Sequence, residues 1–71
     1  MATKVEAEVG GTIWKLVATP GERIEADTPI LLVESMKMEI PVVAPRDGVL
    51  LSILVAEGDL VAEGQIVAEL E

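Results

Sequence analysis

The sequence predicts an all-β domain, a small sandwich or barrel made of two similar halves. Segment 11–34 recurs as 48–71 without a gap, runs rich in Val, Ile and Leu alternate with turn-forming residues, and prolines interrupt the chain. β-branched residues suit strands, and short strands at roughly 8–12 residue spacing are typical of sandwiches and barrels. Because neither copy can bury its own apolar face alone, we expect the halves to pack face to face, and we expect closure to remove exposed strand edges.

The two copies, 11–34 and 48–71, align at a constant offset of 37 residues. Most aligned pairs are two glycines or two apolar residues, and the last pair is the glutamate that ends each copy. The pairs are Gly11 with Gly48, Gly21 with Gly58, Ile13 with Leu50, Leu16 with Ile53, Ile24 with Val61, Ile30 with Val67, Val33 with Leu70, and Glu34 with Glu71. Such regularity indicates two copies of one structural unit. One pair departs from the pattern, since Gly64 aligns with Asp27, which enters a left-handed turn less freely than glycine.

Each copy is predicted to contain short strands separated by turns. The strand before the first copy spans 4–9, where polar and apolar residues alternate as in a half-buried strand. Further strands are predicted over 12–18, 30–34, 49–56 and 66–70, with glycine-centred turns at 20–22 and 57–59. Pro29, Pro41 and Pro45 argue against helix and suit strand ends or edge strands.

The length and composition exclude several classes of function. A chain of 71 residues allows one domain, predicted over 1–71, without room for a deep catalytic cleft. It has no Cys, and therefore no disulfide and no thiolate metal site, and it has no His. We predict no metal site. Trp14 is the only aromatic residue, and packing or partial exposure on a sheet face is expected for it rather than ligand stacking.

The charge argues against nucleic acid and anionic membranes as partners. Thirteen acidic and five basic residues give a net charge of −8, which opposes binding to phosphate-rich surfaces. No apolar run approaches the roughly 20 residues of a membrane helix. The N-terminal residues lack the apolar core of a secretory signal, so a cytoplasmic location is expected.

The segment joining the copies contains an unusual turn. The strand that ends near Glu34 must reverse before another begins near Met38, which places Met36 and Lys37 at the tip of a tight hairpin. Asn-Gly or Asp-Gly is expected at such a tip, because Met and Lys disfavour a positive φ. A turn that departs from local rules is a candidate functional site.

Lys37 offers an amine on a flexible stem, which can be acylated. Acylation requires the neutral amine, whereas the carboxylates of Glu34 and Glu39 nearby in sequence favour the ammonium form. A separate modifying enzyme would therefore have to activate it. On spacing and charge alone, an ordinary solvated surface lysine remains the alternative.

The residues around this turn resemble a known family. Glu34-Ser35-Met36-Lys37-Met38-Glu39 is similar to the biotinyl-domain signature, usually Glu-Ala-Met-Lys-Met-Glu. The resemblance extends over nearly the whole chain, through Ala44-Pro45, Gly48-Val49, Gly58-Asp59, Val61 and Gly64-Gln65. It implies a flattened barrel of two four-stranded antiparallel sheets with quasi-two-fold symmetry, a barrel-sandwich hybrid. The biotinyl lysine lies on a hairpin turn in this family, with the termini at the opposite end.

The resemblance implies a biotin carboxyl carrier that is not itself an enzyme. Biotin would be joined to Lys37 by a biotin protein ligase, with Met36 and Met38 as flanking recognition residues. The carrier would serve a biotin carboxylase, which uses ATP and bicarbonate, and a carboxyltransferase, whose acceptor the sequence does not reveal. The gapless repeat leaves no room for the thumb insertion of some carriers. The chain therefore resembles thumbless biotinyl domains. Because it begins at Met1 with no linker or upstream domain, it is similar to stand-alone single-domain carriers, with an excised terminal domain of a larger carboxylase as the alternative, and we expect a monomer in isolation.

Two departures from the family pattern are visible. Ser35 replaces the usual alanine, a small-for-small change that should be tolerated. Near the N-terminus the family often has Ala-Pro-Met-Pro-Gly, where this chain has Glu8-Val9-Gly10-Gly11. The second departure puts in doubt the contacts that this N-terminal segment makes in the family. It does not affect the expectation for Lys37.

Three alternatives remain open. A lipoyl carrier shares the fold but usually has Asp-Lys-Ala at the turn, so Met36 and Met38 favour biotin. An enzyme with a Ser35–Lys37 dyad lacks an evident pocket or oxyanion hole. A purely structural domain that has lost its cofactor is disfavoured by the intact Met-Lys-Met sequence.

Overall fold

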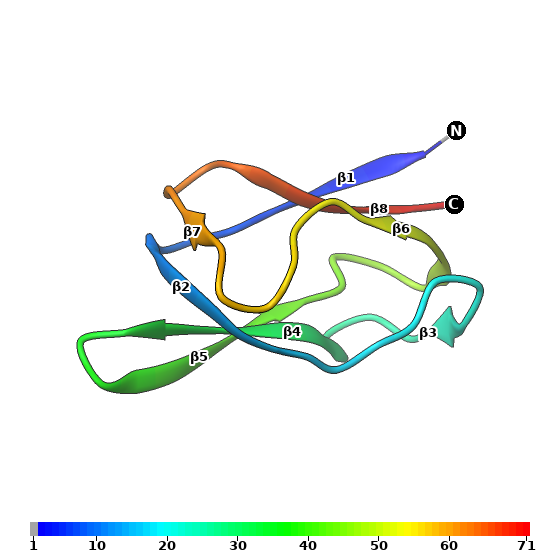
Figure 1. Ribbon diagram of the computed structural model, residues 1–71. Coiled ribbons are helices and arrows are strands. Elements are labelled where there is room, and N and C mark those ends of the chain that lie inside the picture. Colours follow the sequence, from blue (N-terminus) through cyan, green and yellow to red (C-terminus); the bar gives the residue numbers. More distant parts are fainter. Residues whose placement is uncertain (1) are drawn as a thin grey trace.

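A computed structural model describes residues 2–71 as eight strands in two sheets, with no helix in that range (Figure 1). The strands are β1 (Thr3–Glu6), β2 (Gly11–Leu16), β3 (Arg23–Ile24), β4 (Pro29–Ser35), β5 (Met38–Val43), β6 (Gly48–Ile53), β7 (Leu60–Val61) and β8 (Ile66–Leu70). One sheet has the order β1-β8-β6-β3 and the other the order β5-β4-β2-β7. All pairings are antiparallel, and the two sheets stay separate rather than closing into one ladder.

The two sheets are related by the sequence repeat. Adding 37 to the residue numbers carries β2, β3 and β4 onto β6, β7 and β8, and carries β1 onto β5. Applied to the order β1-β8-β6-β3, this exchange yields β5-β4-β2-β7, which is the order of the second sheet. The symmetry therefore includes β1 and β5, which lie outside the two copies found in the sequence. The fold implied by the family resemblance, two four-stranded sheets with quasi-two-fold symmetry, is confirmed.

Each half contributes one short strand to the sheet of the other half. β3 pairs with β6, and its counterpart β7 pairs with β2. Matching hydrogen bonds hold these exchanges: the Gly21 N–H donates to the Leu50 carbonyl oxygen at 2.7 Å, and the Gly58 N–H donates to the Ile13 carbonyl oxygen at 2.8 Å. Neither half completes a four-stranded sheet by itself, because every sheet needs a strand from both.

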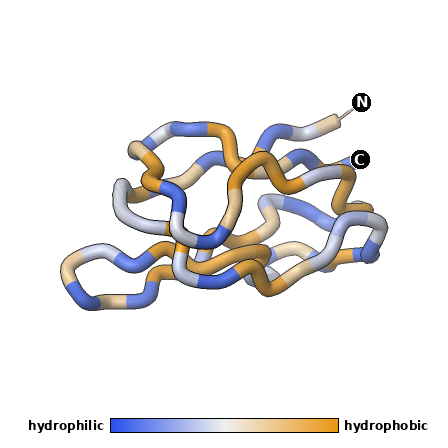
Figure 2. Tube along the Cα trace, viewed as in Figure 1, coloured by the Kyte–Doolittle hydropathy of each residue, from blue (hydrophilic) through white to orange (hydrophobic). Residues whose placement is uncertain are grey.

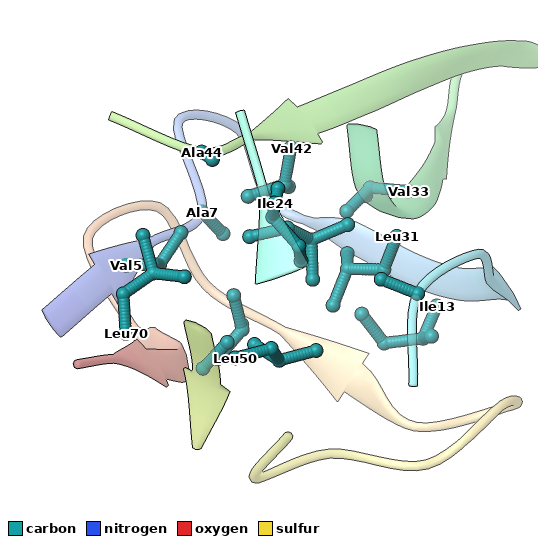
Figure 3. Packing of buried hydrophobic residues seen from close by; sticks show 14 of the residues in the cluster. Val5, Ala7, Ile13, Ile24, Leu31, Val33, Val42, Ala44, Leu50 and Leu70 are labelled. Atoms are coloured by element: carbon teal, nitrogen blue, oxygen red, sulfur yellow. The ribbon is translucent and has the colours of Figure 1, made fainter. Parts of the chain in front are cut away.

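The core lies between the sheets and consists of aliphatic side chains (Figures 2 and 3). Its largest fully buried members are Ile13, Ile30, Leu31, Leu50, Leu70, Val33 and Val67. Burying a Leu or Ile side chain stabilises the fold by about 1.5–3 kcal/mol relative to leaving it exposed. No polar or charged side chain is buried among residues 2–71, so the core rests on apolar packing alone.

Left-handed turns occupy equivalent places in the two halves. Gly21 and Gly58 have φ values of 95° and 93°, and Asp27 at 68° matches Gly64 at 84°. The Asp27 N–H donates to the Ala44 carbonyl oxygen at 2.8 Å, and the Gly64 N–H donates to the Ala7 carbonyl oxygen at 2.7 Å. The prediction that Asp27 takes the place of a turn glycine is confirmed.

The strand predictions were correct in place and less accurate in extent. The first strand ends at Glu6 rather than at residue 9, because the register with β8 shifts at Val5/Glu6 and the chain then turns away. β3 and β7 were missed, since two residues are too few for a periodic pattern. Pro41 lies in edge strand β5 and Pro29 begins β4, as expected. The longest connections, 17–22 and 54–59, are equivalent to each other, so neither carries a thumb.

Candidate functional site

The β4–β5 hairpin carries the residues singled out by the sequence. The two strands pair from Pro29↔Val43 to Ser35↔Met38, and Met36 and Lys37 form the two-residue turn. Both turn residues have positive φ, 53° for Met36 and 65° for Lys37. Positive φ at both central positions is the requirement of a type I′ hairpin turn. The predicted tight hairpin with unfavourable turn residues is therefore confirmed.

The strain in this turn is imposed by the strands below it. A left-handed conformation costs a residue other than glycine about 1–2 kcal/mol. The hairpin register is set by core side chains, since Leu31 pairs with Val42, and both of them, like Val33, are buried. Shifting this register by one residue would move the buried row of side chains into solvent. The packed part of the hairpin thus determines that Met36 and Lys37 occupy the turn.

The tip of the hairpin stands clear of the rest of the molecule (Figure 1). Pairing of β2 with β4 ends at Thr12↔Glu34, whereas β4 and β5 continue to pair one step further. Lys37 is exposed, and the exposed fractions of Met36 and Met38 are 92% and 64%. Both chain ends lie at the opposite end of the molecule in Figure 1, as the family resemblance implied.

Two carboxylates and a serine lie near Lys37 on the hairpin. Glu34 and Glu39 are exposed cross-strand partners just below the turn. Ser35 pairs with Met38 and continues the inward row of Val33, while Lys37 occupies the turn, so Ser35 and Lys37 do not share a strand face. The arrangement presents an amine to solvent, where an external enzyme can reach it.

A glycine that the sequence identified only as part of the repeat supports the hairpin. A Cβ on Gly11 would overlap the carbonyl oxygen of Glu34 and would lie 2.9 Å from Cγ1 of Val33. The backbone of β2 therefore lies tightly against β4 at the base of the exposed tip. The signal available in the sequence was the alignment of Gly11 with Gly48, whose Cβ would meet the carbonyl oxygen of Glu71 at 2.5 Å.

An open groove lies elsewhere, near the quasi-two-fold axis. Its lining includes the equivalent pairs Ala7 with Ala44 and Asp27 with Gly64, and no residue of the segment 34–39. Among residues 2–71, no three His, Cys, Asp or Glu side chains are grouped so as to hold a metal ion. In the same range, no helix is long and apolar enough to span a membrane.

Comparison with known proteins shows the family of the chain. Residues 1–70 match the biotin/lipoyl family model, described as "Biotin-requiring enzyme". The chain is 41% identical over 66 residues to the biotin/lipoyl attachment protein of Bacillus subtilis, covering 93% of this chain and 90% of that protein. It is 38% identical over 61 residues to a biotinylated protein homologue of Mycobacterium leprae, covering 86% of each.

A solved structure has the same fold. The urea carboxylase of Kluyveromyces lactis matches with a TM-score of 0.96 and 35% identity, over 100% of this chain and 6% of that enzyme. The chain thus corresponds to nearly all of a small attachment protein and to a small part of a large carboxylase. The family resemblance drawn from the Met-Lys-Met segment is confirmed, and the chain belongs to the biotin/lipoyl attachment family.

Proposed function

We propose that biotin is attached to Lys37 and that the chain, as a single carrier domain over 1–71, is a non-catalytic biotin carboxyl carrier. The observation that carries the proposal is the position of Lys37: an exposed lysine in a strained two-residue turn, between two exposed methionines, on a protruding hairpin. An ordinary surface lysine requires neither the strain nor the flanking methionines. The two similar small proteins, one of them described as the homologue of a biotinylated protein, support biotin as the attached group.

The hairpin fits the role of a tether. The Lys37 amine would form an amide by displacing the activating group from a biotin carboxyl group that the ligase has activated, and its four-carbon stem gives the arm flexibility. Attached biotin supplies a group that accepts a carboxyl from a biotin carboxylase and gives it up at a carboxyltransferase. The packed strands below the turn hold the attachment point on a rigid base, so only the arm has to move.

Met36 and Met38 are proposed as recognition residues for the enzymes that handle Lys37. Their exposure is otherwise unfavourable for apolar side chains, which gain by leaving water on contact with a partner. The polarizable, unbranched thioether adapts to surfaces of different shape, which suits a carrier that meets several partners in turn.

The partners of the carrier follow from this role. They are a biotin protein ligase, a biotin carboxylase and a carboxyltransferase, and the chain is expected to be a monomer between encounters. A cytoplasmic location is part of the proposal.

Modification in the presence of an active ligase tests the proposal. The chain is co-expressed with a biotin protein ligase in biotin-supplemented cells, and its intact mass is measured together with capture on avidin. We expect one biotinyl group per chain, none on Lys37→Arg, and full modification of Lys15→Arg, a matched change at an exposed lysine of β2. Circular dichroism should show both variants folded. A wild-type chain left unmodified by a ligase that modifies other carriers would disprove biotin attachment.

A lipoyl carrier is the second candidate, because a relative of nearly the same length is described as a biotin/lipoyl attachment protein. The same mass measurement distinguishes the two, since biotinyl and lipoyl groups add different masses. Parallel co-expression with a lipoate ligase should leave the chain unmodified. Lipoylation without biotinylation would reverse the assignment.

A further inference from the structure

The outer face of the β5-β4-β2-β7 sheet carries an exposed row of apolar side chains. Trp14 lies at the bulge of β2, next to Lys15, which is the cross-strand partner of Leu32 of β4, and Leu32 also pairs with Pro41 of β5. Leu60 of β7 pairs with Thr12, two residues from Trp14 along β2. We call Trp14, Leu32, Pro41 and Leu60 the apolar strip. The exposed fraction is 80% for Leu60 and 47% for Trp14; Pro41 is exposed and Leu32 half-buried.

The equivalent row of the other sheet carries three charged residues and one leucine, although its backbone is the same. The repeat places Leu51, Glu69, Lys4 and Arg23 where the strip has Trp14, Leu32, Pro41 and Leu60. Lys4 pairs with Glu69, which places opposite charges at neighbouring positions, and the Ser52 hydroxyl donates to Glu69 Oε1 at 3.4 Å. The fold thus accepts charged residues at these positions. The apolar strip is a property of the face that bears the Lys37 hairpin, and stability does not demand it.

Carboxylates flank the apolar strip on two sides. Glu34 and Glu39 form the next exposed row toward the hairpin tip. On the β2 side, Oε2 of Glu57 accepts a hydrogen bond from the Leu16 N–H at 3.1 Å. Lys15 is the basic residue within this group. Such a surface complements a partner with an apolar centre and a basic rim.

A second copy of the chain does not suit this surface. Stable pairs of proteins bury about 800 Å² on each partner, which is far more than four side chains expose. Two copies would also each carry a net charge of −8, so their acidic rims would repel one another. The size and charge of the strip match a transient encounter with a basic protein.

We propose that the apolar strip is the docking surface for the biotin carboxylase that acts on the group carried by Lys37. The inference rests on the proposed function. Both substrates of that enzyme, ATP and bicarbonate, are anions, so the surroundings of its active site are expected to be positively charged. Leu32 precedes Lys37 by five residues, or about 16 Å at 3.3 Å per strand residue, so an enzyme holding the strip has the arm within reach.

The ligase has a different requirement. It acts on the lysine amine itself, and therefore has to bring the hairpin tip to its active site. A carboxylase acts at the far end of a longer arm, so it can hold the body of the carrier at a distance from the reaction. The strip is accordingly assigned to the carboxylase, and modification by the ligase should not depend on it.

Replacement of strip residues by their counterparts in the other half tests the proposal. Leu60→Arg and Leu32→Glu introduce the side chains found at residues 23 and 69 in the same backbone setting. The biotinylated proteins are assayed as substrates of the biotin carboxylase from the same organism. We expect the KM for the carrier to rise at least ten-fold in each variant, with kcat within two-fold of wild type. Leu51→Ser, the matched control on the other sheet, should leave both constants unchanged.

Several measurements keep the outcomes distinct. The ligase should modify the unmodified wild-type protein and the strip variants at equal rates. If the variants lowered the ligase rate but left the KM of the carboxylase unchanged, the strip would be a ligase-binding surface, and the proposal would be overturned. Unchanged KM values in both variants would overturn it as well. Should Leu60→Arg fail to fold by circular dichroism, Leu60→Ser serves instead, with an expected three-fold rise in KM.

Sedimentation at assay concentrations should show monomers, and a wild-type dimer that Leu60→Arg dissociates would favour self-association over docking. Failure of the proposed function itself is recognised separately, as a wild-type chain that no biotin ligase modifies.

Discussion

The two ends of the molecule occupy equivalent places in the repeat and are built differently. At one end, β4 continues into β5 through the turn at Met36 and Lys37. At the other end, β8 and β1 pair at Leu70↔Thr3, where the chain has its two ends and no turn joins the strands. Arg46 connects them instead: its Nε donates to Oγ1 of Thr3 at 2.9 Å, and its Nη1 donates to the Glu71 carbonyl oxygen at 3.0 Å.

The difference shows how one architecture serves two purposes. The residue equivalent to Arg46 is Val9, an apolar residue that packs against the core, and at that end the covalent turn joins the strands. The hairpin end is closed by a strained turn that holds Lys37 away from the body. The terminal end is held by side-chain hydrogen bonds, which are individually weaker. Variants at equivalent positions can test each part of this contrast.

The largest effect on stability is expected at Gly11 and Gly48, which occupy equivalent positions at the two ends of the molecule. Gly11→Ala should lower the free energy of unfolding by about 3 kcal/mol, because its Cβ would overlap the Glu34 carbonyl oxygen beside buried Val33. Gly48→Ala should cost less, about 1 kcal/mol, because the opposing Glu71 lies beyond the last residue of β8 and is held by single hydrogen bonds to Arg46 and Val49 rather than by a packed strand pair. Urea denaturation measures both. Equal losses would mean that the two ends are equally rigid.

Loss of the Arg46 hydrogen bonds should affect the terminal end alone. Arg46→Ala should lower the free energy of unfolding by about 1–2 kcal/mol, since it removes bonds to Thr3 and Glu71. Amide hydrogen exchange should become faster in β1 and remain unchanged in β4. Arg23→Ala, at an exposed position of β3, is the control and should change stability by less than about 0.5 kcal/mol. Faster exchange in β4 as well would contradict independent ends.

Relief of strain at the hairpin turn should stabilise the protein. Met36→Asn places a residue that tolerates the left-handed conformation at a φ of 53°, and should raise the free energy of unfolding by about 1 kcal/mol. Lys37→Gly should give a similar gain while removing the amine. Thermal unfolding measures the gain, with Met38→Asn, outside the turn, as control. A loss of stability in both turn variants would show that the turn is not strained.

The smallest effect is expected from the carboxylate pair below the turn. Like charges at cross-strand positions destabilise a sheet, so Glu39→Gln should stabilise the hairpin by about 0.2–0.5 kcal/mol. The gain should shrink with added salt, because the pair is exposed. Thermal midpoints at low and high ionic strength measure it, and Glu8→Gln, outside the strands, should show no such gain. A gain independent of salt would point to a cause other than charge repulsion.

Much of the fold and the candidate site could be predicted from sequence because their signals are local or periodic. Ile13 and Leu50, aligned in the repeat, are both buried, and the turn chemistry at Gly21 and Gly58 appears in the same places of both halves. The strand reversal between Glu34 and Met38 followed from the ends of two hydrophobic runs. Lys37 therefore had to lie at or beside the hairpin tip.

Other features depend on residues that are far apart in the chain. The pairing of β3 with β6 and of β7 with β2 leaves no trace in a two-residue strand. Gly11 was visible as part of the repeat, but its close approach to Glu34 was not. The membership of β1 in the symmetry was not predicted, because the copies recognised in the sequence begin at Gly11; the equivalence of Ala7, just after β1, with Ala44 is clear only from their shared hydrogen-bond pattern.

The sequence by itself determined the all-β class, the repeat and the position of Lys37 between its copies, because hydrophobic periodicity and turn residues act over short stretches of chain. The tertiary structure decided which side chains meet and which stay in water. From hydrophobicity alone, leucine would be expected to be more buried than alanine. In the structure Ala7 is 1% exposed, whereas Leu60 is 80% exposed. Burial depends on what the rest of the chain places over a residue, and for Leu60 the described part of the chain places almost nothing there.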